Sequence, residues 1–257
     1  MSTALSATSH VFSVNTEDGP PMTMHVGIVG SDGVVLAGDT LAWDYPNADS
    51  IASRQGLSTR MSPTVSKIKV SDDRKIAVSC AGYFREAYPL ADGIIAGLSP
   101  EFWQYPERRV YEIARSCAAS HPRWRDTQSF ILLSEPMPAL YLLDCWADER
   151  TNEPLSLQCR RVPLYAFAGD ALNGAIYWAM RYCRTLSPEM RTLHRLTRLA
   201  SQIIADAGAL DTGNVGGLEV VRCDSAGIDQ LTDRGNETLL QEAQQRSNQI
   251  QRLIIGE

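Results

Sequence analysis

Hydrophobic positions along the chain cluster into short runs, and the first two runs flank a turn. Residues 23–30 (TMHVGIVG) and 33–40 (GVVLAGDT) are mainly apolar, and the turn between them contains an Asp-Gly pair. Because Asp-Gly tolerates positive φ, this pattern predicts a β-hairpin. A second pair of strands is predicted for residues 66–72 and 74–82, which flank another short polar turn.

The rest of the chain alternates between blocks of predicted helices and blocks of predicted strands. Residues 44–63 are polar and broken by Pro and Gly, which predicts a long loop of the kind that is often functional. Blocks of this kind favour an α+β fold in which helices cover antiparallel sheets. The predicted helices span 84–98, 107–120, 171–184, 188–207 and 237–254, and the predicted strands span 129–135, 139–147, 155–170 and a hairpin within 217–232.

Composition narrows the classes of function. The formal net charge of -6 argues against a nucleic-acid partner, because phosphates attract basic surfaces. No apolar stretch reaches the ~20 residues of a membrane-spanning helix. Residues 1–21 lack the basic start and apolar run of a signal peptide. The sequence therefore predicts a cytoplasmic protein without a membrane partner.

The cysteines and histidines do not predict a metal site. The six cysteines form no CxxC pair, and most lie in apolar surroundings, which is typical of buried, reduced thiols. The four histidines are scattered, without the spacing of zinc ligands. We therefore expect neither a metal nor another cofactor.

Common catalytic motifs are also missing from the sequence. There is no GxSxG elbow, no HExxH, no P-loop and no GxGxxG opening a helix. With so few histidines, a Ser-His-Asp triad is not indicated. An enzyme of this composition needs another general base, and a free α-amino group, with a pKa near ~7.7–8, can take a proton from the hydroxyl of the same residue.

Four residues at corresponding strand ends fit that chemistry. Thr23 heads the first strand, and a tight hairpin brings Asp39 back beside it, while Lys67 and Gly82 begin and end the next strand pair. The Thr23 hydroxyl would attack a carbonyl. The Lys67 ammonium would lower the pKa of the α-amine and stabilise a forming alkoxide, with Asp39 keeping Lys67 charged. The Gly82 N–H would donate to the oxyanion.

These motifs resemble the proteasome β-subunit family, including its simpler bacterial relatives, over nearly all of residues 23–232. The family opens with Thr-Thr-Thr-Val-Gly-Ile, where this chain has TMHVGI, and its DGVVLAAD corresponds to DGVVLAGD ending at Asp39. Its Lys followed by an apolar residue corresponds to Lys67-Ile68, and its Ala-Gly oxyanion element to Ala81-Gly82. The run FAGDALNGAIYWA is similar to its Gly-rich turn into a helix.

The resemblance implies a fold, an activity and partners. It implies the N-terminal-nucleophile hydrolase fold, a four-layer αββα sandwich of two antiparallel sheets flanked by helices. It implies a threonine peptidase that cuts peptides or unfolded proteins inside a homo-oligomeric ring or related stack, often served by an ATP-dependent unfoldase. By the same resemblance, Asp211, in the segment Asp211-Thr212-Gly213-Asn214, is the acid near the nucleophile.

The chain also departs from the family pattern. Asp170 and Asn214 stand where the family has serines, and we expect both to support the site through hydrogen bonds. Leu41 stands where the family commonly has Arg, and the loop 44–63 is longer than in most relatives. These departures bear on substrate preference. The residues predicted to contact substrate are Ala42, Trp43, Cys80 and Phe84.

The proposed nucleophile is not the first residue of the sequence. Residues 1–22 are rich in Ser and Thr and predict a disordered leader, a propeptide or a mis-assigned start, and residues 23–257 form the single domain. Translation from Met22 would expose the Thr23 amine, because aminopeptidases remove Met before Thr. Two other functions fit the pattern: a catalytically inactive structural subunit, and an N-terminal-nucleophile amidase acting on a small amide.

Overall fold

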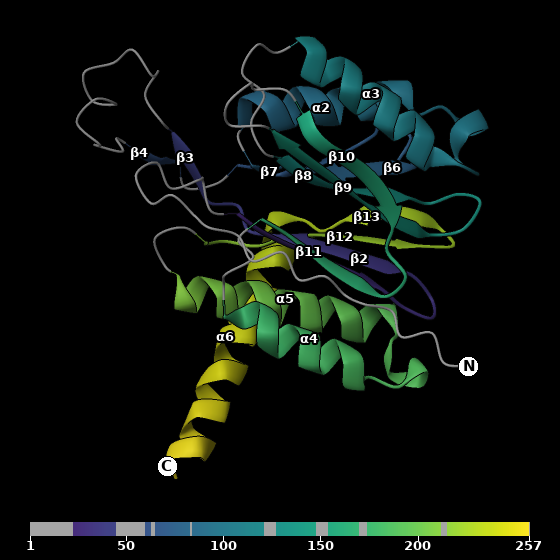
Figure 1. Ribbon diagram of the computed structural model, residues 1–257. Helices are drawn as coiled ribbons and strands as arrows, with labels where there is room; N and C mark the ends of the chain where they lie inside the picture. Colours follow the sequence, from purple (N-terminus) through teal and green to yellow (C-terminus); the bar gives the residue numbers. More distant parts are fainter. Residues whose placement is uncertain are drawn as a thin grey trace, which may run out of the picture.

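Within the residues that the structure describes, the fold is an α+β arrangement of two antiparallel sheets with five helices packed against them (Figure 1). One sheet has the strand order β11-β1-β2-β12-β13, and the other has the order β10-β9-β8-β6-β5 with β7 paired to β8. The computed structural model describes residues 23–44, 60–62, 65–82, 84–120, 127–147, 154–169, 174–211 and 215–256.

The five-stranded sheet is built around the first predicted hairpin. Strand β1 pairs with β2 in the register His25↔Gly38, and β2 pairs with β12 in the register Glu219↔Gly38. Successive side chains alternate between the two faces of the sheet. One face packs against helices and the other against the second sheet. Its strands are β1 (Met24–Val29), β2 (Val34–Gly38), β11 (Tyr165–Gly169), β12 (Glu219–Asp224) and β13 (Gly227–Gln230).

The six-stranded sheet contains the second predicted strand pair. Strand β5 pairs with β6, which pairs with the central strand β8. A small additional sheet joins β3 to β4 at the two ends of the predicted loop. The strands of the larger sheet are β5 (Ile68–Val70), β6 (Ile76–Ser79), β7 (Ala81–Gly82), β8 (Thr127–Leu133), β9 (Ala139–Ala147) and β10 (Pro154–Arg161), and those of the small sheet are β3 (Ala42–Asp44) and β4 (Arg60–Ser62).

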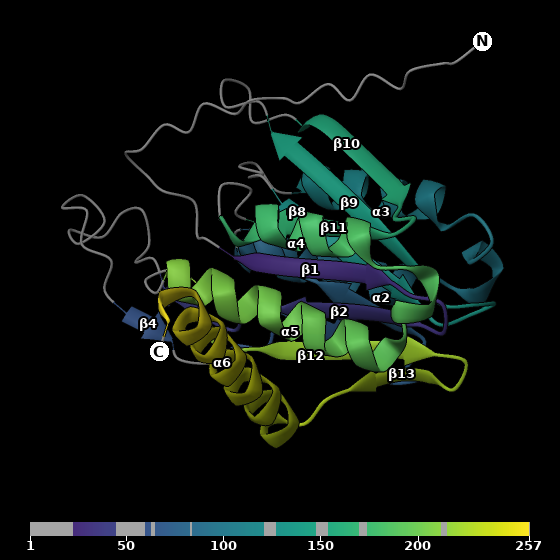
Figure 2. The same cartoon turned by 90° about the horizontal axis from the view of Figure 1, so that it is seen from below.

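Helices cover the outer face of each sheet (Figure 1 and Figure 2). Three apolar clusters hold the layers together. Helix α5 shows why: Leu196, Ala200, Ile203 and Ala207 recur at helical spacing and are buried against β1 and β2. A third cluster, which includes Phe130, lies between the sheets. The helices are α2 (Phe84–Gly97) and α3 (Pro106–Ser120) on the six-stranded sheet, and α4 (Ala175–Thr185), α5 (Leu193–Leu210) and α6 (Asp233–Ile255) on the other side.

Three expectations about element boundaries are corrected. The run 155–170 is two strands in different sheets, β10 and β11, because Pro163 lies between them and the chain crosses over. Helix α5 starts at Leu193, because Pro188–Met190 form a separate 3-10 turn. Helix α6 starts at Asp233, four residues earlier than predicted, with the Thr232 hydroxyl accepting from the N–H of Gly235 as a cap.

Two other predictions, the loop 44–63 and the leader 1–22, fall partly or wholly outside the described residues. Within the predicted loop 44–63, Asp44 ends β3 and residues 60–62 form β4, so these residues are strand, whereas residues 45–59 and 63 lie outside the described residues. The predicted leader 1–22 also lies outside them. Among the helices that are described, none is both long and apolar enough to cross a membrane.

Candidate active site

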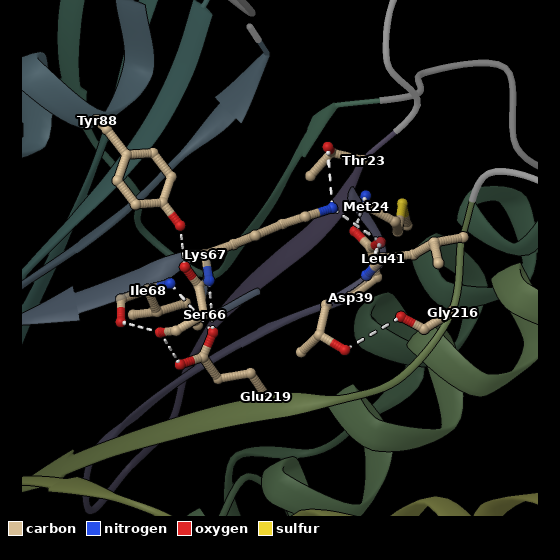
Figure 3. A network of polar contacts seen from close by, with 11 residues as sticks. Thr23, Met24, Asp39, Leu41, Ser66, Lys67, Ile68, Tyr88, Gly216 and Glu219 are labelled. Atoms are coloured by element: carbon tan, nitrogen blue, oxygen red, sulfur yellow. Dashed lines mark hydrogen bonds and ion pairs between the residues drawn. The ribbon is translucent and has the colours of Figure 1, made fainter. Parts of the chain in front are cut away.

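Thr23, Asp39 and Lys67 meet at one end of the sandwich (Figure 3). The Nζ of Lys67 donates to Thr23 Oγ1 over 3.2 Å and to Asp39 Oδ2 over 2.9 Å. Asp39 is held in turn, because its Oδ1 accepts from the N–H of Met24 and its Oδ2 from the N–H of Leu41. The sequence therefore predicted correctly that these three side chains lie together.

The fold explains this meeting. Thr23 precedes β1 and Asp39 follows β2, so the antiparallel hairpin places them side by side. Lys67 precedes β5 of the other sheet and extends its side chain across the space between the sheets, as Figure 3 shows. All three residues are at most 4% exposed.

Burial sets the electrostatics of the Lys67–Asp39 pair. Burial lowers the pKa of Lys67, and the adjacent Asp39 carboxylate opposes that change. Burial likewise raises the pKa of Asp39, and the Lys67 ammonium and the N–H groups of Met24 and Leu41 oppose it. Burial therefore disfavours each charge, and the partner offsets part of that cost. An ammonium in this position can donate to a developing negative charge on Thr23 Oγ1.

Gly169 fixes the backbone of Thr23 at the end of β11. Its φ is +98°, and an added Cβ would lie 1.7 Å from the carbonyl oxygen of Thr23. Its N–H donates to Gln128 Oε1, and Gln128 Nε2 donates to Asp144 Oδ1. A glycine is required here because any side chain would displace residue 23.

His25 lies two residues after Thr23 and faces the second sheet. It is fully buried, and neither ring nitrogen has a hydrogen-bond partner among the described residues. Burial and the nearby Lys67 charge lower its pKa to about 3, so the ring is neutral. An added Cβ at Gly38 would lie 2.4 Å from the His25 ring. The glycine in DGVVLAGD, where the family has Ala, therefore makes room for His25.

Gly82 and Asp211 were predicted to complete the catalytic group. Gly82 lies in β7, which pairs with β8 and contacts β11, and its φ of +114° favours glycine. Asp211 ends α5, where its N–H donates to the carbonyl of Ala207 and its carbonyl accepts from the N–H of Val215. The roles of Gly82 and Asp211 toward Thr23 remain predictions.

The predicted substrate-contacting residues fall into two groups. Cys80 is 4% exposed and packs against α2, with its Sγ 3.6 Å from the carbonyl of Ala87, and burial raises the pKa of its thiol to about 12. Its thiol is thus buried against α2. The backbone of β3 contains Ala42 and Trp43, and Phe84 begins α2. The predicted supporting residues Asp170 and Asn214 lie outside the described residues.

Sequence reasoning missed three residues of this region: His25, Gln128 and Glu219. Glu219 is 5% exposed and accepts hydrogen bonds from the backbone of the Lys67 segment. A carboxylate within the apolar run LEVV, at the start of β12, was the available signal. His25 and Gln128 gave no comparable signal, because the residues that surround them come from other strands.

No protein-family model and no curated protein matches this chain. The functional assignment therefore depends on the geometry of the site. Within the described ranges, no three His, Cys, Asp or Glu side chains cluster as metal ligands would. All six cysteines are free thiols. The geometry of Thr23, Asp39 and Lys67 therefore carries the functional argument.

Proposed function

We propose that the protein is an N-terminal-threonine hydrolase that cuts peptide bonds, with Thr23 as the nucleophile. The observation that carries this proposal is the 3.2 Å hydrogen bond from Lys67 Nζ to Thr23 Oγ1, in a pair with Asp39. A lysine buried to 1% exposure has a high desolvation cost, which structural packing alone does not require. A buried lysine directed at a hydroxyl supports nucleophilic catalysis.

Thr23 follows Met22 in the sequence, so the proposal requires that the bond between them is cleaved. The freed α-amine then takes the proton of Oγ1 as Oγ1 attacks the scissile carbonyl carbon. The tetrahedral intermediate carries its negative charge on the former carbonyl oxygen, for which the Gly82 N–H is the proposed donor. The amine returns the proton to the leaving nitrogen, and water hydrolyses the resulting ester.

The fold supports the same proposal. Two stacked antiparallel sheets with helices outside each are consistent with the four-layer αββα sandwich of N-terminal-nucleophile hydrolases. We accordingly propose that the chain is related to the proteasome β-subunit family, as its motifs suggest. The position of Thr23 at the start of β1 and of Lys67 at the start of β5 supports this proposal.

We also propose that the chain assembles with copies of itself. Helix α4 exposes Tyr177, Trp178 and Tyr182 at 75%, 60% and 51%. Aromatic side chains gathered on one exposed helix are typical of protein interfaces. An ATP-dependent unfoldase remains a partner suggested by the resemblance alone.

Peptide hydrolysis by protein that begins at Thr23 tests the proposal. Such protein is obtained by starting translation at Met22. We expect it to hydrolyse fluorogenic peptides and Thr23→Ala to be inactive. We also expect the rate to rise with pH until the α-amine is neutral, at or below its ordinary pKa of about 7.7–8 because the Lys67 ammonium lowers that pKa. A folded protein that begins at Thr23 and has no activity would favour the inactive structural subunit, and activity in Thr23→Ala would exclude the mechanism.

A further inference from the structure

Glu219 occupies a position between the two sheets that its sequence neighbours do not explain. It begins β12, and its register with Gly38 places it in one row with Gly38 and His25 across three adjacent strands. Within β12, Val221 and Cys223 alternate with Val220 and face the second sheet, so Glu219 faces it too. A carboxylate that is 5% exposed in this layer needs partners in the opposite sheet.

Those partners belong to the segment that contains Lys67 (Figure 3). Glu219 Oε2 accepts from the backbone N–H groups of Lys67 and Ile68 over 2.9 and 3.1 Å. Glu219 Oε1 accepts from Ser66 Oγ over 2.7 Å and from Gln230 Nε2 over 2.8 Å. One carboxylate of the five-stranded sheet thus receives three hydrogen bonds from three consecutive residues of the six-stranded sheet.

This arrangement ties the lysine to the sheet that holds its targets. Thr23 and Asp39 flank the hairpin of the five-stranded sheet, whereas Lys67 belongs to the other sheet. The carbonyl of Lys67 accepts from the N–H of Cys80, a bond within its own sheet, while its N–H donates to Glu219 across the gap. The backbone of Lys67 is therefore fixed from both sheets.

We propose that Glu219 is a positioning residue, which holds Lys67 Nζ within hydrogen-bond distance of Thr23 by fixing residues 66–68 to β12. The expected loss of rate rests on the proposed function, whereas the effect of Glu219 on the position of Lys67 does not. Charge-assisted bonds from a carboxylate to backbone N–H groups are short and strong, so the tie is rigid. A catalytic group displaced by about 1 Å can lose about 100-fold in rate.

Three variants distinguish the effect of the hydrogen bonds to residues 66–68 from the effect of the negative charge of Glu219. Glu219→Ala removes all four hydrogen bonds, and we expect kcat to fall about 100-fold with KM within about twofold, because Glu219 does not contact substrate. Glu219→Gln can keep the hydrogen bonds to residues 66–68, since its amide oxygen accepts from both backbone N–H groups and its NH₂ donates to Ser66 Oγ. The Gln230 side-chain amide flips, so that its oxygen instead of its NH₂ faces residue 219. We expect kcat within about fivefold of wild type. Gln230→Ala, the matched control, leaves the bonds to Lys67 and should remain within about twofold.

Glu219→Asp covers the case in which the alanine variant does not fold. It keeps the charge but is one methylene shorter, so residues 66–68 must move or lose their acceptor, and we expect at least about a tenfold loss of kcat. Crystal structures of the folded variants provide a readout that is independent of activity. In Glu219→Ala or Glu219→Asp, Lys67 Nζ should lie beyond hydrogen-bond distance, about 3.5 Å, from Thr23 Oγ1.

These readouts distinguish the two ways of being wrong. If wild-type protein that begins at Thr23 hydrolyses no peptide, the proposed function fails, and the crystal structures alone decide the positioning role. If Lys67 Nζ keeps its place in the folded aspartate or alanine variant, or if those variants keep wild-type kcat, Glu219 is not a positioning residue. A glutamine variant as impaired as the alanine variant would also overturn the inference.

Discussion

Replacing Lys67 with Met should lower kcat for peptide hydrolysis by about 1000-fold or more. The ammonium is the group that contacts Thr23 Oγ1, and its loss removes both the field that tunes the α-amine and a donor to the forming charge. Met keeps much of the apolar volume of the lysine side chain, so the packing around it changes little. The measurement is steady-state hydrolysis of a peptide by protein that begins at Thr23.

Stability must be separated from catalysis in that variant. Lys67→Met alone leaves the Asp39 carboxylate, which is 0% exposed, without its cation, and such losses cost about 3–5 kcal/mol. The matched variant combines Lys67→Met with Asp39→Asn, which removes both charges and keeps an acceptor for the N–H of Met24. We expect the double variant to unfold near the wild-type denaturant concentration and to be equally inactive. A folded single or double variant within tenfold of wild-type kcat would rule out the lysine's role.

Acidification should destabilise the protein through the buried His25. The pKa of His25 is lowered from 6.5 to about 3 in the folded state, so the unfolded chain binds its proton more tightly. The part of the unfolding free energy that depends on neutral His25 is therefore fully present above pH 6.5 and is lost as pH falls toward 3. The loss is about 2 kcal/mol at pH 5 and at most about 5 kcal/mol below pH 3.

Comparison of variants isolates this effect from the carboxylates that also titrate on acidification. His25→Gln should remove about 2 kcal/mol from the difference in unfolding free energy between pH 7.5 and pH 5, whatever its effect on absolute stability. His194→Gln is the matched control, because His194 is exposed on α5. Chemical denaturation at both pH values is the measurement. Equal pH dependence in wild type and His25→Gln would show that His25 is not buried as a neutral ring.

Local patterns predicted the elements that hold the site. The Asp-Gly turn and the apolar runs around it gave the β1–β2 hairpin, and a hairpin of that length places Asp39 beside Thr23 without further information. The run after Lys67 likewise gave β5 and β6. The prediction that the two sheets stack so that Lys67 reaches Thr23 came from the family resemblance, because no local sequence pattern specifies which sheet faces which.

Contacts between distant strands account for what the sequence did not show. Glu219 contacts Lys67 across 152 positions, and Gly169 accommodates Thr23 only because β11 pairs with β1. The split of 155–170 into β10 and β11 was missed although Pro163 lies between them, because both halves have strand propensity and the crossover between sheets is not visible in the sequence. In the sequence His25 was one of four scattered histidines, and only the fold shows Gly38 and Lys67 close to it.

The most direct test of the central claim is the intact mass of the protein after exposure to a peptide β-lactone, which acylates an activated hydroxyl. Two proteins are compared: one begins at Thr23, and the other carries a single Gly before it, which keeps the hydroxyl but moves the amine away. The account predicts one adduct per chain, located on Thr23 by fragmentation, in the first protein and none in the second. Equal labelling of both proteins, or an adduct on a residue other than Thr23, would contradict it.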